Sequence, residues 1–217
     1  MCFSATASFV AGSALSAVGV ATITKAKGKA EIPFAAIPLL FGIQQIIEGV
    51  IWLSFGSPLL NTAMTYAYSI FSHVLWPIFI PFSILLLETD RLRKKILYLF
   101  FVVGLAVGMY LLYFILADPV TSQIVNNSIA YLSPHLYPLW IVAFYVVVTC
   151  GSAIVSKHKI INIFGITLFV AFVIAGYFFN ETFFSVWCFF AAILSVLVFW
   201  YFKRKPVNNL ATFSLRS

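Results

Sequence analysis

Apolar residues fill seven long stretches of this chain, and short polar or Gly/Pro-containing segments separate them. A helix needs about 20 mostly apolar residues to cross the hydrocarbon core of a bilayer, and each stretch is close to that length. The stretches are apolar nearly all round, as expected for helices in a membrane bundle. They predict transmembrane helices at residues 5–24, 32–55, 62–87, 96–116, 138–155, 160–179 and 183–202.

This pattern predicts an all-α, polytopic membrane bundle of seven helices. The bundle occupies one domain, residues 1–205, and a short cytoplasmic tail follows at 206–217. A β-barrel is excluded, because its strands are segments of about 10 residues with alternating polarity. Composition agrees with the bundle, since 63% of the 217 residues are hydrophobic and only 9% are charged. So few charges exclude an ordinary soluble domain and a disordered chain.

Positive charge is confined to alternate connections of the predicted bundle. All 13 Lys and Arg residues lie in the first, third and fifth connections or in the segment that follows the last predicted helix, residues 203–217. Connections rich in Lys and Arg stay in the cytoplasm, so the pattern predicts an outside N-terminus and a cytoplasmic C-terminus. The net charge of +7 then indicates contact with anionic lipid and gives no reason to expect nucleic acid as a partner.

Polar side chains in the second helix are candidate ligand-binding groups. Gln44, Gln45 and Glu48 lie within an apolar stretch, and Gln44, Glu48 and Trp52 share one face at four-residue spacing. An ionised carboxylate facing lipid is costly, so Glu48 should face the bundle interior. There it can bind a proton, a cation or a substrate. A hydrogen-bonded structural glutamate is the alternative.

The third helix carries a matching polar stripe. Its candidate ligand-binding residues recur every three or four positions and so share one face: Tyr66, Ser69, His73 and Trp76. Pro77 and Pro81 remove backbone donors, so this helix should bend and make room for a cavity. The second and third helices are joined by a short connection and should be antiparallel neighbours. We therefore expect Glu48 and His73 to face each other in one pocket in the outer half of the membrane.

Small residues at four-residue spacing indicate close helix packing. Ser8, Gly12 and Ser16 recur in the first helix, and Gly104 and Gly108 recur in the fourth. Such spacing lets helix backbones approach closely. We expect these residues to pack helices within one chain.

The sequence lacks the residues and motifs needed to bind several common cofactors. The last helix contains no lysine for a retinal Schiff base, and no nucleotide-binding motif occurs. The three cysteines form no CxxC pair, which excludes a zinc ribbon.

Two resemblances accompany these motifs. The opening Met1–Phe9, with Gln44, Gln45, Glu48, Gly49, Trp52, His73, Trp76 and Pro77, resembles a family of small bacterial membrane proteins that begin with Met-Cys-Phe-Ser and have no assigned activity. This resemblance implies a bacterial inner (plasma) membrane and a site in its outer half. The chain resembles more weakly the seven-helix hydrolases that include alkaline ceramidases, which hold zinc with three histidines, an aspartate and a serine. That resemblance implies a metal site on the outer side that draws on His73 and His135, with Glu48 or Cys2 in place of the missing ligands.

Three functions remain open, in order of preference. The first is a protein that binds, senses or transports a small molecule, a lipid headgroup or a proton in a polar outer-half cavity. The second is a structural subunit that binds another membrane protein through its apolar surface, which is 18% aromatic by composition. The third is a metal-dependent intramembrane hydrolase.

Overall fold

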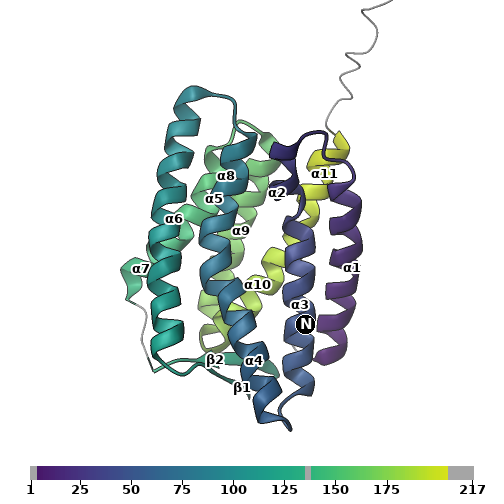
Figure 1. Cartoon of the computed structure of the whole chain (residues 1–217), viewed down its shortest axis with the longest axis vertical. Coiled ribbons are helices and arrows are strands. Elements are labelled where there is room, and N and C mark those ends of the chain that lie inside the picture. The colour runs from purple at the N-terminus through teal and green to yellow at the C-terminus, as the bar shows by residue number, and fades with distance from the viewer. Residues whose placement is uncertain (1–3, 135–137, 205–217) are drawn as a thin grey trace, which may run out of the picture.

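The computed structural model describes residues 4–134 and 138–204 and shows a bundle of roughly antiparallel helices (Figure 1). Helical residues occupy all seven expected stretches. The helical elements, in order, are α1 Ala5–Ile23, η1 Lys29–Glu31, α2 Ile32–Ala35, α3 Ile37–Leu53, α4 Pro58–Ser69, η2 Ile70–Leu75, α5 Trp76–Leu87, α6 Arg91–Ala117, α7 Leu139–Val146, η3 Val147–Gly151, α8 Ser152–Val155, α9 Lys159–Phe178, η4 Asn180–Thr182, α10 Phe183–Leu194 and α11 Val196–Arg204.

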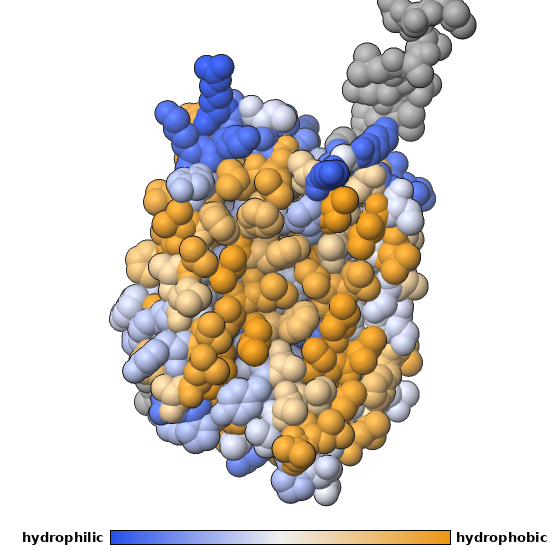
Figure 2. Space-filling model, in the orientation of Figure 1, coloured by the Kyte–Doolittle hydropathy of each residue, from blue (hydrophilic) through white to orange (hydrophobic). Residues whose placement is uncertain are grey.

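Six of these helical stretches are long and apolar enough to cross a membrane. A seventh, Leu139–Val155, is apolar but shorter. Hydrophobic side chains cover the middle of the visible surface, and hydrophilic ones gather at the end where α6 begins (Figure 2). This is the surface of an integral membrane protein, and it supports the predicted helical bundle.

The described Lys and Arg residues lie at one end of the bundle, which we call the basic end. They occupy the end of α1, the start of α6, the connection from α8 to α9 and the end of α11 (Figure 1). Cation–π contacts fix part of this end, since Lys25 lies over the Phe199 ring and Arg204 lies over Trp200. The segregation of charge expected from the sequence is therefore present in three dimensions.

A two-stranded hairpin covers the opposite end, which we call the hairpin end. Strands β1 (Thr121–Val125) and β2 (Ser128–Leu132) pair antiparallel through a turn at Asn126 and Asn127, whose φ angles are 49° and 57°. Positive φ at both central residues is the backbone of a tight hairpin turn, and asparagine tolerates it better than most residues do. The hairpin lies in the long connection between two predicted helices, for which no strand was predicted from the sequence, and the rest of the described chain keeps the predicted helical bundle.

Glycines bring the helices together within the chain, as expected. Gly12 of α1 packs on Ile46 and on the Gly42 backbone of α3, while Gly104 of α6 packs on the Pro77 carbonyl of α5. Pro81 has no N–H, so it cannot form the usual helical hydrogen bond to the Pro77 carbonyl. The free carbonyl oxygen can therefore be approached closely by a residue without a Cβ atom. The Lys29–Leu53 stretch, which ends with α3, is the most enclosed of the six long apolar stretches, with 61% of its residues buried against 28% for α1 and α6.

The third helix is irregular where proline was expected to bend it. The segment η2, just before Pro77, is a π-helix with i→i+5 hydrogen bonding. With i→i+5 hydrogen bonding, the backbone N–H of residue 77 would donate to the Ser72 carbonyl, but Pro77 has no N–H. The Tyr145 hydroxyl of α7 donates to the Ser72 carbonyl instead. A second π-helix, η3, follows directly after α7.

Glu88 ties two connections together at the basic end. Its carboxylate accepts hydrogen bonds from the backbone N–H groups of Thr89, Asp90 and Lys157, at 2.9, 3.0 and 3.1 Å. Burial opposes ionisation of Glu88, but these donors and the Lys157 ammonium outweigh it, so the pKa of Glu88 lies below its usual value. Lys157 also donates to the Thr89 hydroxyl. The carboxylate thereby fixes the α5–α6 connection against the α8–α9 connection.

Candidate functional site

The polar residues of α3 are buried inside the bundle. Gln44, Gln45 and Glu48 all have 0% exposure. The Ser185 hydroxyl of α10 donates to Glu48 Oε1 at 2.6 Å, and Cys188, one helical turn further along α10, lies beside Gln44. Glu48 therefore faces the bundle interior and not lipid, as the cost of burying a charge in hydrocarbon predicts.

Gln45 has a buried carboxamide that meets no partner in the described part of the chain. Neither its nitrogen nor its oxygen makes a hydrogen bond there, and the same is true of the Trp52 indole nitrogen and the Ser8 hydroxyl. An unsatisfied buried polar group costs about 1–3 kcal/mol, and such groups in native proteins call for an explanation such as a bound water or ion. Trp52 lies two turns from Gln45 on the same face, with Glu48 between them. Gln45, Glu48 and Trp52 thus form a buried polar stripe along one face of α3.

His73 is buried in the π-helix η2. Its Nδ1 lies 2.7 Å from the Ser72 hydroxyl, and its ring centre lies 4.1 Å from that of Phe184 in α10. Phe184 directly precedes Ser185, the partner of Glu48. The two residues that were expected to face each other thus contact adjacent positions on one turn of α10. A direct pairing of Glu48 with His73 stays a prediction.

Trp76 joins two helices that carry predicted site residues. Its indole nitrogen donates to Gln44 Oε1 at 2.8 Å, and its ring stacks on Phe41 with 3.8 Å between the ring centres. Ser69 instead donates to the Thr65 carbonyl of its own helix. The Tyr66 hydroxyl accepts a hydrogen bond from the Val120 backbone. The residues of the predicted stripe therefore do not share one site: Trp76 contacts α3, Ser69 bonds within its own helix, and Tyr66 contacts the segment before the hairpin.

The hairpin closes the polar region at its own end of the bundle. Tyr131 of β2 stacks on Tyr68 of α4, with ring centres 4.3 Å apart and planes inclined by 3°. Ser122 of β1 is fastened to α4, because it accepts a hydrogen bond from Thr65 and donates one to Asn61, each at 3.0 Å. The sequence reasoning missed Tyr68, Tyr131 and Ser185. The Asn126-Asn127 pair between two short segments that contain Ile, Val and Tyr was the available signal for the hairpin.

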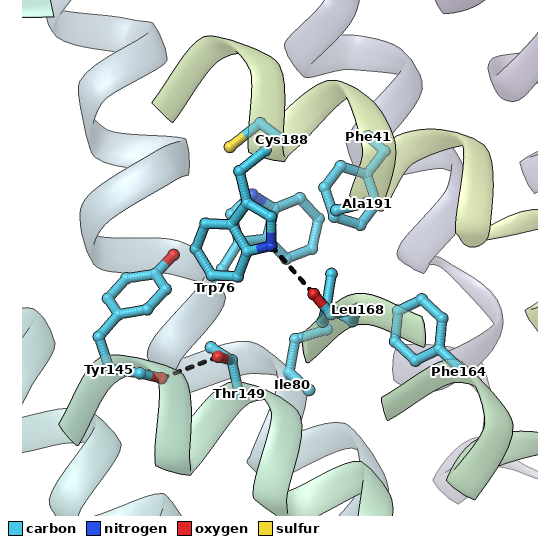
Figure 3. Close-up of a pocket in the computed structure, with 10 residues that line it drawn as sticks. Phe41, Trp76, Ile80, Tyr145, Thr149, Phe164, Leu168, Cys188 and Ala191 are labelled. Atoms are coloured by element: carbon cyan, nitrogen blue, oxygen red, sulfur yellow. Dashed lines mark hydrogen bonds between the residues drawn. The ribbon is translucent and has the colours of Figure 1, made fainter. Parts of the chain in front are cut away.

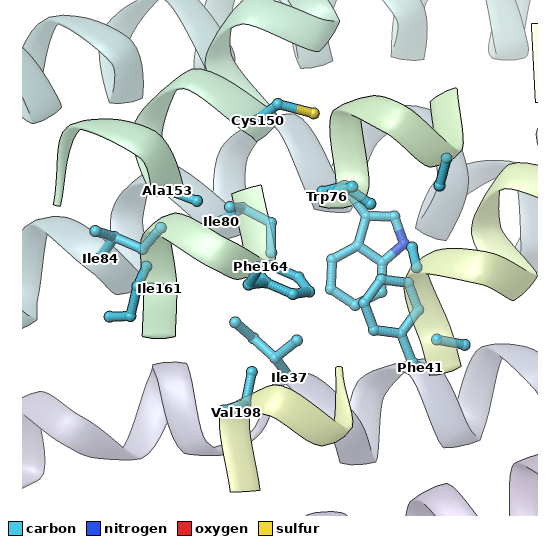
Figure 4. Close-up of a cluster of buried hydrophobic side chains, with 14 of the residues drawn as sticks. Ile37, Phe41, Trp76, Ile80, Ile84, Cys150, Ala153, Ile161, Phe164 and Val198 are labelled. Atoms are coloured by element: carbon cyan, nitrogen blue, oxygen red, sulfur yellow. The ribbon is translucent and has the colours of Figure 1, made fainter. Parts of the chain in front are cut away.

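A small apolar cavity lies beside the polar residues and toward the middle of the bundle. Its volume is about 20 Å³, room for about one water molecule. The side chains that line it are Phe41, Trp76, Ile80, Tyr145, Thr149, Phe164, Leu168, Trp187, Cys188 and Ala191 (Figure 3). Ile80 and Phe164 also belong to the main apolar core, which continues from the cavity to Ile84, Ile161 and Val198 (Figure 4). Trp76 and Cys188 lie between this cavity and the polar residues of α3.

A metal centre is not assembled by the described residues. Within residues 4–134 and 138–204, no three His, Cys, Asp or Glu side chains are grouped so that they could hold a metal ion. Of the four candidate ligands, Glu48 and His73 are described and buried, whereas His135 and Cys2 lie outside the described residues.

The fold and surface define a polytopic helical membrane protein with polar groups buried in its core. The chain belongs to a family of unknown function, DUF6629, whose model matches residues 1–213. No curated protein and no solved structure matches the chain.

Proposed function

We propose that this protein binds a small polar molecule carrying a positive charge, in a site formed by Gln45, Glu48 and Trp52. The site lies in the half of the bundle nearer the hairpin. The bound ligand is then either transported or sensed by the protein. The burial of Gln45 without a hydrogen-bond partner among the described residues is the observation that carries the proposal.

The chemistry of the three side chains selects the ligand class. The carboxylate of Glu48 attracts a cation or an ammonium group, and the Trp52 ring face can add a cation–π contact. The carboxamide of Gln45 offers one acceptor and two donors, which suit a hydroxyl or carbonyl on the same ligand. A short amino alcohol, free or as a lipid headgroup, has both features.

We also propose that the hairpin end faces outward and that the basic end faces the cytoplasm of a bacterial inner membrane. The gathering of Lys and Arg at one end supports this orientation, because such residues are retained in the cytoplasm. In this orientation Gln45, Glu48 and Trp52 belong to the half of the bundle nearer the outer leaflet.

Ethanolamine is the probe that tests the site. In lipid nanodiscs, saturable quenching or enhancement of tryptophan fluorescence by ethanolamine is expected, and the Trp52→Phe variant should lose most of this signal. Gln45→Leu and Glu48→Gln should each weaken binding at least tenfold, about 1.4 kcal/mol. Gln123→Leu, on the exposed face of β1, is the matched control and should bind like the native chain.

Thermal stability separates a binding role from a purely structural one. Gln45→Leu replaces an unsatisfied amide with an apolar group, so it should raise the melting temperature of the ligand-free protein. It should also abolish the stabilisation that ethanolamine gives the native chain. A Gln45→Leu variant that is less stable and binds ethanolamine normally would show that Gln45 is structural and that the site is elsewhere.

A further inference from the structure

Three cations gather around one turn of α11 at the basic end. Lys25, two residues beyond α1, has its Nζ atom 5.6 Å from the centre of the Phe199 ring. The Lys203 Nζ atom and the Arg204 guanidinium carbon lie 5.8 and 5.0 Å from the centre of a Trp200 ring. Because Phe199 and Trp200 are adjacent in α11, the three positive charges occupy one corner of the molecule. We call Lys25, Lys203 and Arg204 the basic corner.

The positive charge of the basic corner is not neutralised by a nearby carboxylate. In the part of the chain that the structure describes, the three cations contact aromatic rings and form no ion pair. Glu31, on the connection after α1, accepts a hydrogen bond from the Lys27 backbone N–H at 3.0 Å, and Glu88 binds the Lys157 backbone. The dipoles of α1 and α11 together add about one negative charge at this end, against three positive charges. The basic corner therefore attracts an anion.

The aromatic rings hold these cations without using their hydrogen-bond donors on an acceptor atom. A cation–π contact is made with the ring face, so the five N–H donors of Arg204 and the three of each lysine are left for another partner. A guanidinium can bind two phosphate oxygens at once, and an ammonium adds a third charge-assisted hydrogen bond. This chemistry suits a phosphate group.

The surface next to the basic corner is apolar and faces outward. Val196 and Trp200 share one face of α11 at four-residue spacing, and their side chains are 40% and 45% exposed. Val20 of the neighbouring α1 is 55% exposed. Near the end of α11, hydrophilic side chains stand directly beside this hydrophobic surface (Figure 2). A free phosphate would use only the cations, whereas a phospholipid would use both the cations and the apolar surface.

We propose that the basic corner binds the phosphate of an anionic phospholipid, whose acyl chains lie along the exposed faces of α1 and α11. Only 28% of the apolar window of α1 is buried inside the protein, so most of this helix is available to lipid. A basic residue near an anionic membrane surface contributes roughly fivefold to lipid affinity. This site is separate from Gln45, Glu48 and Trp52 and does not depend on what they bind.

Native mass spectrometry of the full chain in dodecyl maltoside tests the site, with equal amounts of phosphatidylglycerol and phosphatidylcholine that carry the same acyl chains. The native chain should retain phosphatidylglycerol at least tenfold more than phosphatidylcholine. Lys25→Gln/Arg204→Gln should reduce this preference to about twofold or less. Arg91→Gln/Lys159→Gln is the matched control, because it removes the same charge from exposed positions at the same end, and it should keep most of the preference.

Two outcomes of this experiment would overturn the proposal. An equal loss of preference in both double variants would show that anionic lipid is attracted only by the total charge of the basic end. Displacement of the lipid by an equal concentration of glycerol 3-phosphate, which has the phosphate but no acyl chains, would show that the apolar surface is not part of the site. Equal melting temperatures of the two double variants in phosphatidylcholine alone establish that neither variant is misfolded.

Fluorescence quenching locates the bound lipid on the native fold. Bromine on the acyl chains of phosphatidylglycerol quenches tryptophan by contact, so it should quench the native chain more than brominated phosphatidylcholine does. This excess should disappear in Trp200→Phe, which keeps all three cations and an aromatic ring. Trp140→Phe, changed at an equally exposed tryptophan of α7, should retain the excess. An excess that persists in Trp200→Phe would place the anionic lipid elsewhere and contradict the proposal.

Discussion

Gly104 of α6 lies directly against the carbonyl oxygen of Pro77 in α5, with no room between them for a Cβ atom. The contact exists because Pro81 cannot donate to that oxygen and because glycine adds no side chain. It holds α6 close to α5, the helix that continues the π-helix η2 in which His73 lies.

Gly104→Ala should therefore destabilise the bundle by about 1–3 kcal/mol, the usual cost of overpacking a tight contact. Thermal unfolding in detergent or nanodiscs measures the effect. Gly56→Ala is the matched control, because a Cβ there meets nothing within 4 Å. Equal melting temperatures for the two variants would show that α5 and α6 can move apart to admit a Cβ atom without loss of stability.

Glu88 should make stability depend on pH in the acid range. Its pKa is lower in the folded protein than in the unfolded chain, so its contribution is complete above the usual pKa of about 4.5. This contribution is lost as the pH falls through the lowered pKa. At neutral pH, Glu88→Gln should cost about 1–3 kcal/mol, because backbone donors lose a charged acceptor.

Unfolding curves at neutral and acid pH check this prediction. The Glu88→Gln variant should show a smaller loss of stability on acidification than the native chain does. Glu181→Gln, an exposed residue of η4, should behave like the native chain. If Glu88→Gln and the native chain lose the same stability on acidification, the carboxylate does not fasten the two connections.

The hairpin turn should tolerate glycine but reject a β-branched residue at position 127. Asn127 has a φ of 57°, a conformation that costs most non-glycine residues about 1–2 kcal/mol. Asn127→Val should accelerate amide hydrogen exchange in β1 and β2 roughly fivefold or more, whereas Asn127→Gly should leave it unchanged or slower. Similar exchange in both variants would mean that the strands are held by their contacts with the bundle and not by the turn.

Labelling with a membrane-impermeant maleimide tests the orientation in cells. In a Cys2→Ser background, a cysteine at Ile124 on the hairpin should react in intact cells. A cysteine at Leu92, exposed at the basic end, should react only after permeabilisation. Native Cys150 and Cys188 are buried and should stay unlabelled. The reverse pattern would place the basic end outside.

Helix positions could be predicted from the length of each apolar stretch and from the charged, Gly and Pro residues that separate the stretches. Which face of each helix is buried could not, since helices that are apolar nearly all round have no polar side to mark it. The polar residues Gln44, Glu48 and His73 were the exception, because the cost of placing them in lipid points them inward. Ser185 and Tyr68 escaped notice, since their contacts depend on how distant helices cross. The hairpin was not predicted because residues 118–137 were interpreted only as a long connection between two helices.

The seventh apolar stretch, Leu139–Val155, has 17 residues and includes the π-helical turn η3. At about 1.5 Å per residue it extends roughly 25 Å, less than the hydrocarbon thickness of about 30 Å. A crossing of the membrane by this stretch would require the lipid beside it to thin or tilt. The bilayer would then be deformed unevenly around the protein. The protein should be enriched in thinner regions of the membrane, or beside other proteins that share the deformation.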